Sequence, residues 1–354
     1  MEKIKIAIVG SGNISNYHIK GYMKNPSAEL YALCDINEEK LKKMGEKYGI
    51  TRLYTDEKKM LEELPEIDAV SVCTWNSAHA PCTIMALDAG KHVLCEKPMA
   101  LNAKEAQEMI DASKRNGKKL MVGFVRRFGN DAAIAKDFID AGSVGDIYYS
   151  KVVYLRRNGC PGGWFGDKER SGGGPLIDLG VHVIDLARYL MGRPMPVSAY
   201  GATFSGMGKR SHLKDNFTDF LSPEKTNAPH TVEDLATALV RFDNGAVLSV
   251  EASFNLHTKT GANNIEMFGT KGGVKLSPDF ELYTEINNYL ANVTLNKPSA
   301  LSFDGLFENE IDYFVESLIN DRDLSSIAED GCTLMKILDA IYESAETGKE
   351  AIIK

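Results

Sequence analysis

Three features that mark other classes of protein are missing from this sequence. It has no run of about 18 consecutive apolar residues, the length a helix needs to cross a bilayer, so we expect no membrane partner. Its six cysteines have neither C-x-x-C spacing nor the density of a secreted disulfide scaffold, which predicts reduced thiols and a cytoplasmic protein. Its net charge of −8, with both signs interspersed, offers no basic stripe and excludes a typical nucleic-acid-binding protein.

The chain has the size and composition of an ordinary globular enzyme. An apolar run begins already at Ile4, so we expect no signal peptide. The length of 354 residues exceeds what one hydrophobic core usually serves. With 44% hydrophobic and 25% charged residues, it has ample material for cores. We predict two domains, residues 1–124 and residues 125–354.

The first half alternates short apolar runs with amphipathic stretches, the pattern of βαβ units on a parallel sheet. We predict strands at Ile4–Val9, Leu30–Cys34, Leu53–Tyr54, Ala69–Cys73, His92–Cys95 and Leu120–Gly123. We predict helices at Ile14–Met23, Glu38–Tyr48, Lys58–Leu64, Ala80–Ala89 and Ala103–Asn116. The apolar runs are continuous rather than alternating, which indicates a sheet covered on both faces, as in a doubly wound Rossmann domain.

The second half has a different pattern, which predicts an α/β domain with an open, largely antiparallel sheet. Predicted strands lie at Ile147–Arg157, Val197–Phe204, Ala236–Phe242, Ala246–Phe254, Asn264–Phe268 and Val274–Leu276. Predicted helices lie at Pro175–Met191, Phe307–Asn320 and Gly331–Thr347. The polar stretch Gly206–Pro229 predicts an exposed loop. We expect the last helix to pack back on the first domain.

A glycine turn follows the first strand and opens the first helix. In this turn Gly10 permits a tight bend, and Gly12 lets backbone approach a pyrophosphate placed at the helix N-terminus, beside Asn13 and Ile14. Ser15 replaces the third glycine of the dinucleotide-binding pattern, a mild departure because serine is small. A plain turn between strand and helix is the alternative explanation.

An acidic residue ends the second strand at the position where dinucleotide-binding proteins hold ribose. Asp35 lies about 20 residues beyond the glycine turn, where a carboxylate accepts hydrogen bonds from ribose hydroxyls. No arginine follows it to neutralise a 2′-phosphate, which favours NAD over NADP. The alternative is that Asp35 caps the next helix.

The triplet Glu96-Lys97-Pro98 places a lysine just past the fifth strand, at the sheet edge where open α/β folds collect ligands. Pro98 stiffens this turn, and a cis bond before it would fix the direction of Lys97. A surface lysine in an ordinary turn is the alternative.

A second candidate segment runs from Gly172 to His182 and places Asp178 and His182 four residues apart, on one face of a helix. Its triple glycine leaves room for a ligand at the helix start. An Asp/His pair at this spacing also suits half a metal site, but no third ligand candidate is near, so we predict no metal. A plain pair on a helix surface is the remaining alternative.

These motifs together resemble those of the glucose-fructose oxidoreductase / inositol dehydrogenase (Gfo/Idh/MocA) family. Glu96, Lys97 and Pro98 align with the family's E-K-P triplet, and Asp178 and His182 align with its G-G-G-x-x-x-D-x-G-x-H segment. The match covers the whole chain. The resemblance implies a Rossmann domain followed by an α/β domain whose open sheet often joins subunits. It also implies a homodimer or homotetramer and an NAD(P)-dependent dehydrogenase of sugars, inositols or related polyols.

The candidate catalytic residues suit that chemistry. Hydride removal from a secondary alcohol requires loss of the hydroxyl proton, and imidazole, with an unperturbed pKa of about 6.5, is well matched to accept it. His182 is therefore the predicted base. The Lys97 ammonium would stabilise developing alkoxide charge, and Asp178 would orient the imidazole or bind a substrate hydroxyl.

Further candidates surround these residues with weaker support. The predicted substrate contacts are Arg126, Asn158 and Trp164, beside Asp178 and His182, while Arg127 is assigned to structure. The predicted cofactor contacts are Gly10, Gly12, Asn13, Ile14, Asp35, Thr74, Asn76, His79, Glu96 and Lys97. His79 is equally explained as a surface residue at a helix start.

Two alternative functions stay open. One is a family variant that retains and recycles NAD, coupling two sugars or assisting glycoside cleavage. The other is a non-catalytic NAD-binding regulator, against which the joint presence of Lys97, Asp178 and His182 argues.

Overall fold

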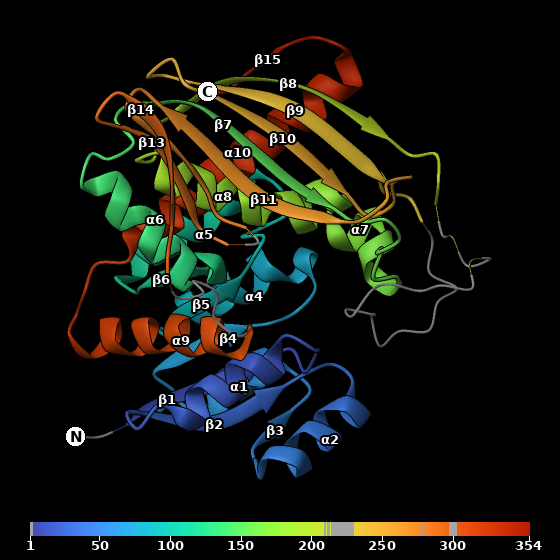
Figure 1. Cartoon of the computed structure of the whole chain (residues 1–354). Helices are drawn as coiled ribbons and strands as arrows, with labels where there is room; N and C mark the ends of the chain where they lie inside the picture. Colours follow the sequence, from blue (N-terminus) through green and yellow to red (C-terminus); the bar gives the residue numbers. More distant parts are fainter. Residues whose placement is uncertain (1–2, 209, 211–212, 214–229, 278, 297–302) are drawn as a thin grey trace. The chain divides into compact units, whose positions relative to one another are not determined.

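The computed structural model describes residues 3–208, 210, 213, 230–277, 279–296 and 303–354 (Figure 1). The chain forms two compact units: Met1–Val125 with Ser302–Met335, and Arg126–Leu301 with Lys336–Lys354. The predicted boundary after residue 124 lies next to this division. The prediction placed residues 302–335 in the second domain, whereas the structure groups them with the first. The predicted loop at Gly206–Pro229 falls largely outside the described residues.

Buried apolar runs build a six-stranded parallel sheet in the first unit. Its strands are β1 (Ile4–Val9), β2 (Ala28–Cys34), β3 (Leu53–Tyr54), β4 (Ala69–Val72), β5 (His92–Glu96) and β6 (Leu120–Gly123). Their order is β3-β2-β1-β4-β5-β6, with every neighbouring pair parallel. The order reverses between β1 and β4, the switch point at which open α/β sheets bind ligands. The predicted Rossmann fold is confirmed.

Helices connect these strands and follow ordinary capping chemistry. They are α1 (Ser15–Lys24), α2 (Glu38–Tyr48), α3 (Glu57–Glu63), α4 (Asn76–Asp88) and α5 (Ala103–Asn116). Asn37, Asp56 and Asn102 each accept a backbone N–H at the start of a helix. Helix α4 begins at Asn76, before the predicted start, and contains Pro81, a residue that usually favours the first helical turn.

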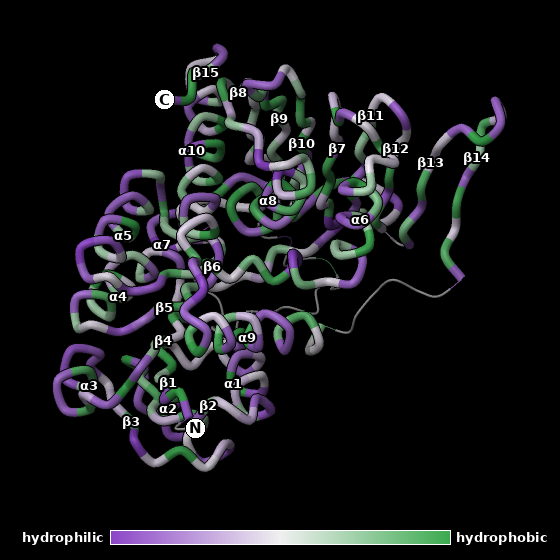
Figure 2. The backbone as a smooth tube through the Cα atoms, turned by 90° about the vertical axis from the view of Figure 1, so that its left-hand side faces the viewer, coloured by the Kyte–Doolittle hydropathy of each residue, from purple (hydrophilic) through white to green (hydrophobic). Residues whose placement is uncertain are grey.

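A helix from late in the sequence completes the first unit. Helix α9 (Phe303–Ile319) lies along α1, as both views show (Figures 1 and 2). The close approach depends on Gly21, because a Cβ atom there would lie 2.9 Å from Cγ1 of Ile311. Lys24 forms an ion pair with Glu308 across the same contact.

Helix α10 (Ser325–Thr347) belongs to both units, with residues up to Met335 grouped with the first and the rest with the second. It begins before the predicted start at Gly331. None of the described helices combines the length and hydropathy that crossing a membrane requires.

The second unit contains a nine-stranded, mostly antiparallel sheet, as predicted. Its order is β14-β13-β12-β11-β7-β10-β9-β8-β15, and only β7 and β10 pair in parallel. The strands are β7 (Ile147–Leu155), β8 (Pro196–Phe204), β9 (Leu235–Phe242), β10 (Val247–Ser253), β11 (Ala262–Gly269), β12 (Gly272–Lys275), β13 (Glu281–Ile286), β14 (Tyr289–Thr294) and β15 (Ala351–Ile352).

Three of these strands escaped the sequence prediction. Strands β13 and β14 form a hairpin whose turn residues, Asn287 and Asn288, both have positive φ. Two consecutive asparagines are compatible with the turn type that hairpins favour, so the signal was present. Strand β15 has only two residues and depends on pairing with β8.

Helices cover one face of the second sheet. Helix α8 (Val181–Leu190) contacts β7 and β11, and α6 (Asn130–Asp140), which was not predicted, packs on α8. The predicted single helix Pro175–Met191 is instead a π-helical segment, η3 (Leu176–Gly180), followed directly by α8.

Candidate active site

The glycine turn after β1 requires its first glycine. Gly10 has φ of +99°, and a Cβ atom there would lie 2.5 Å from the carbonyl oxygen of Cys73. At Gly12 a Cβ atom would meet only that same oxygen, at 4.0 Å. Helix α1 then starts without a side-chain cap, and backbone N–H groups at a helix start attract anions. The turn, which includes Asn13 and Ile14, thus fits a pyrophosphate.

Asp35 lies at the end of β2 and bonds across this turn. Its Oδ2 accepts hydrogen bonds from the N–H and the hydroxyl of Ser11, both at 2.6 Å. Its Oδ1 accepts the N–H of Asn37 at 2.7 Å. The residue that caps helix α2 is Asn37, whose side chain accepts the N–H of Lys40. The alternative that Asp35 caps this helix is therefore wrong. The carboxylate is half-exposed, as a ribose contact requires.

The segment after β4 supplies three further candidates. The Thr74 hydroxyl donates to the Trp75 carbonyl at 3.2 Å, and Asn76 is buried in the first turn of α4. His79 is only 1% exposed, so its explanation as a surface residue is wrong. Its Nδ1 lies 2.7 Å from the carbonyl oxygen of Pro98, and burial lowers its pKa. A neutral His79 therefore secures the turn that carries Lys97.

That turn follows β5. Lys97 is half-exposed, and the peptide bond between Lys97 and Pro98 is cis. Glu96 is 5% exposed, and its Oε2 accepts the N–H of Lys97 at 3.0 Å. The Glu96 side chain therefore holds the backbone from which Lys97 extends.

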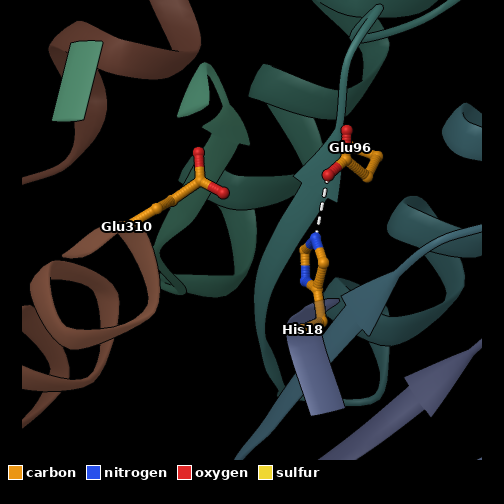
Figure 3. A group of neighbouring side chains, drawn as sticks. All are labelled: His18, Glu96 and Glu310. Carbon is orange, nitrogen blue, oxygen red and sulfur yellow. Dashed lines mark hydrogen bonds and ion pairs between the residues drawn. The ribbon is translucent and has the colours of Figure 1, made fainter. Parts of the chain in front are cut away.

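Behind Glu96 lies a buried cluster that the sequence did not reveal (Figure 3). His18, on α1, places Nε2 2.8 Å from Oε1 of Glu96. Glu310, on α9, is fully buried and points toward both, and neither of its carboxyl oxygens has a hydrogen-bond partner among the described residues. The donor atoms of the three side chains all lie within 4.8 Å of one another. Two ligands of one tetrahedral metal lie about 3.4 Å apart, so the His18–Glu96 distance fits a hydrogen bond better.

Asp178 and His182 occupy the second unit, on the continuous segment formed by η3 and α8. Both side chains are half-exposed, whereas Leu179, Gly180 and Val181 between them are buried. The segment thus presents these two polar groups on its accessible side, within a helix that is otherwise mostly buried.

The interpretation of the triple glycine is wrong. A Cβ atom on Gly173 would lie 2.1 Å from the hydroxyl oxygen of Tyr342, and one on Gly174 would lie 2.3 Å from the carbonyl oxygen of Glu233. The space is filled by the protein itself. Gly172, with φ of +83°, ends the short helix α7 (Lys168–Ser171).

The weaker substrate candidates also lie in the second unit. Arg126 donates to the Asn263 side chain at 2.7 Å. Asn158 pairs with Asn255 in an isolated β-bridge. Trp164 is half-exposed and stacks on Phe165, so it is not a core tryptophan.

Arg127, in contrast, is structural, as predicted. It forms a buried ion pair with Asp185, through Nε at 2.9 Å and Nη2 at 2.6 Å. Such bidentate pairs fix geometry in a protein interior.

The doubly wound sheet with its glycine turn defines a dinucleotide-binding protein with a second α/β unit. Comparison with protein families agrees: residues 4–124 match the oxidoreductase family Gfo/Idh/MocA with an NAD-binding Rossmann fold, and residues 133–275 match the Gfo/Idh/MocA C-terminal domain. The chain therefore belongs to the Gfo/Idh/MocA oxidoreductase family, and its first domain binds NAD.

Individual relatives extend over most of the chain. It is 33% identical over 348 residues to the D-glucoside 3-dehydrogenase of Escherichia coli (strain K12), covering 98% of this chain and 96% of the relative. It is 30% identical over 273 residues to the myo-inositol 2-dehydrogenase of Thermotoga maritima, covering 77% and 74%. A solved levoglucosan dehydrogenase in complex with NADH superposes with a TM-score of 0.87 at 25% identity, over 100% of both chains.

Proposed function

We propose that this protein is an NAD-dependent dehydrogenase that moves a hydride between nicotinamide and a secondary hydroxyl of a sugar, an inositol or a related polyol. The observation that carries the proposal is the half-exposed pair of Asp178 and His182 on an otherwise buried segment. The three relatives named above act, by their names, on a glucoside, an inositol and levoglucosan. All of these compounds carry ring hydroxyls.

The chain's residues divide the work as follows. The glycine turn at Gly10 and Gly12 holds the pyrophosphate, and Asp35 accepts the ribose hydroxyls. Asn13, Ile14, Thr74 and Asn76 border the same cofactor site. When bound, NAD supplies the hydride acceptor.

His182 takes the proton of the substrate hydroxyl, and Lys97 stabilises the charge that develops on that oxygen. Asp178 orients the imidazole or binds a neighbouring hydroxyl. Arg126, Asn158 and Trp164 complete the substrate site. In this assignment residues 1–124 bind the cofactor, and residues 125–354 bind the substrate and join subunits.

The test is a screen for NADH formation at 340 nm over glucosides, anhydrosugars, inositols and aldoses. We expect turnover with at least one ring polyol, and none in its absence. Wild-type protein that binds NAD yet oxidises no member of this panel would contradict the proposal and favour the regulatory alternative.

A recycling enzyme is the second candidate, because an aldose-aldose oxidoreductase from Caulobacter crescentus superposes with a TM-score of 0.81 at 26% identity. The absorbance of the purified, acid-denatured protein separates the two candidates. Stoichiometric NAD retained through gel filtration supports recycling, whereas an apo protein that needs added NAD supports the dehydrogenase.

We further propose a homodimer or homotetramer joined through the sheet of the second unit. Tyr200 and Leu239 face each other across β8 and β9, and they are 53% and 48% exposed. Exposed apolar neighbours of this kind are common at subunit interfaces. Leu239→Lys is expected to lower the mass measured by light scattering, while the exposed Glu285→Lys control is not.

The proposed compartment is the cytoplasm, as the composition predicted. All six cysteines are thiols rather than disulfides, and thiols persist in a reducing compartment.

A further inference from the structure

We propose that Glu233, supported by Tyr342, is a positioning residue that fixes the start of the segment carrying Asp178 and His182. The inference rests on the function proposed above, because positioning matters only if those two side chains act on substrate. Neither Glu233 nor Tyr342 belongs to a motif that the sequence singled out.

The Glu233 carboxylate accepts three hydrogen bonds. The side chain is 6% exposed. Its Oε2 accepts the N–H of Gly174 at 2.9 Å, and its Oε1 accepts the N–H of Leu176 at 3.2 Å and the Tyr342 hydroxyl at 2.9 Å. Hydrogen bonds to an ionised acceptor are stronger than neutral ones, so this carboxylate anchors the backbone firmly.

The donors are the backbone groups from which the catalytic segment starts. Gly174 lies just before η3 and Leu176 is its first residue, and a carboxylate at this end also interacts favourably with the helix dipole. The next link is direct, because the N–H of Asp178 donates to the carbonyl oxygen of Gly174 at 3.1 Å. His182 follows in the first turn of α8 without a break in helical backbone.

The glycines explain how the anchor fits. Side chains at Gly173 or Gly174 would overlap Tyr342 or Glu233, as the distances above show. The Tyr342 hydroxyl stays protonated as a donor, because burial and the adjacent Glu233 charge raise its pKa well above the ordinary value. Gly173 and Gly174 therefore leave room for an internal anchor rather than for a ligand.

Loss of the anchor moves the catalytic side chains. A misplacement of about 1 Å can lower turnover by about 100-fold. Glu233→Gln keeps the side-chain volume but replaces one carboxylate oxygen with an NH₂ group. Because NH₂ is a donor, it cannot accept a hydrogen bond from the backbone N–H that it faces. Tyr342→Phe removes one donor and leaves the backbone bonds. Ser150→Ala is the matched control, because Ser150 is equally buried in this unit and donates to the carbonyl oxygen of Glu266 at 3.0 Å.

The experiment measures kcat, KM, NAD affinity and amide hydrogen exchange for these three variants. For Glu233→Gln we expect kcat to fall between about 10- and 100-fold, with an unchanged Kd for NAD and faster exchange over residues 172–182. Tyr342→Phe is expected to show the same changes at smaller size, and Ser150→Ala to show neither.

Wild-type kcat and exchange in both Glu233→Gln and Tyr342→Phe would overturn the inference, as would a fall in kcat that Ser150→Ala reproduces. If Glu233→Gln does not fold, Tyr342→Phe alone decides by the same criteria. If the wild-type protein oxidises no polyol, the proposed function fails by itself. In that case amide hydrogen exchange alone tests the anchor. Exchange over residues 172–182 at the wild-type rate in Glu233→Gln and Tyr342→Phe would overturn it, and faster exchange in these variants would support it.

Discussion

Each unit buries glutamates beside the segment that carries a proposed catalytic side chain, but these glutamates meet opposite surroundings. Glu233, near the His182 segment, faces two backbone N–H groups and a hydroxyl. Glu310, behind the Lys97 turn, has no hydrogen-bond partner in the part of the chain that the structure describes, and it lies beside another carboxylate, Glu96. Burial disfavours charge unless donors replace water. Burial without donors therefore favours the neutral acid at Glu310, whereas Glu233 has the donors that replace water.

This difference shows that burial alone does not set the charge of a carboxyl group. In the second unit the carboxyl group that accepts backbone N–H groups is the anchor itself, Glu233. In the first unit the corresponding group is Glu96, which bonds His18 and the N–H of Lys97, and a neutral Glu310 adds no competing charge beside it. Both arrangements hold the backbone next to a side chain that we propose to act in catalysis.

The largest expected effect comes from removing the proposed general base itself. His182→Ala should lower kcat between about 100- and 10,000-fold, because a positioned general base contributes that much. This exceeds the effect of removing the anchor at Glu233. The Kd for NAD, measured by titration, should stay within a factor of about two. His257→Ala is the control, since His257 is exposed, and comparable losses in both variants would show that the effect is not specific.

The glycine turn offers a second contrast, between stability and binding. Gly10→Ala should lower the free energy of unfolding by about 2 kcal/mol or more and abolish NAD binding, because its φ and its contact with Cys73 both exclude a side chain. Gly12→Ala should leave stability nearly unchanged, since its Cβ atom meets no close neighbour, but weaken NAD binding by filling the approach to the pyrophosphate.

Chemical denaturation and titration of both variants check this expectation. Equal stability loss in the two variants would contradict it, and so would retention of wild-type NAD affinity by Gly12→Ala.

The comparison of the two glutamates is tested most finely by pH. Burial, and then the charge of Glu96, raise the pKa of Glu310 well above its ordinary value of 4.5. A raised pKa in the folded state means that stability is fully present below the unfolded pKa. It is lost as pH rises, by up to about 1.4 kcal/mol per pH unit, until the folded pKa is reached. The groups facing Glu310 are His18 and Tyr22 on α1, Cys73 directly after β4, and Glu96 at the end of β5.

Glu310→Gln removes the titrating carboxyl group, and with it the loss of stability at rising pH, but leaves the neighbouring side chains in place. Its stability relative to the wild type should therefore improve between about pH 5 and pH 8. Glu233→Gln should instead be less stable than the wild type by about 1 to 3 kcal/mol across that range, because buried N–H donors lose an ionised acceptor. Thermal unfolding across this pH series measures both. A Glu310→Gln protein that loses stability at every pH, together with stoichiometric metal in the wild type, would assign the cluster to a cation instead.

Much of the fold was predictable because local pattern and long-range structure agree in the first unit. The strands Ile4–Val9, Leu53–Tyr54 and Leu120–Gly123 lie where continuous apolar runs placed them. Asp35 and Lys97 could be proposed as site residues because parallel strands end at one edge and the chain leaves each strand with a polar residue; their roles stay predictions. The second unit was harder, since β15 exists only through pairing with a distant strand.

The parts of the site that escaped prediction depend on contacts between distant residues. Glu233 and Tyr342 are separated by 109 positions and His18 and Glu96 by 78. No periodicity or spacing links them. For the same reason the triple glycine was misinterpreted, because its neighbours come from other parts of the chain.

We propose above all that Lys97 of the first unit and His182 of the second act on one hydroxyl. A crystal structure with NAD and a polyol substrate tests it most directly. We expect the Lys97 ammonium and the His182 imidazole both to lie within about 3 Å of the same substrate oxygen. A substrate held by only one of them, or by neither, would contradict it.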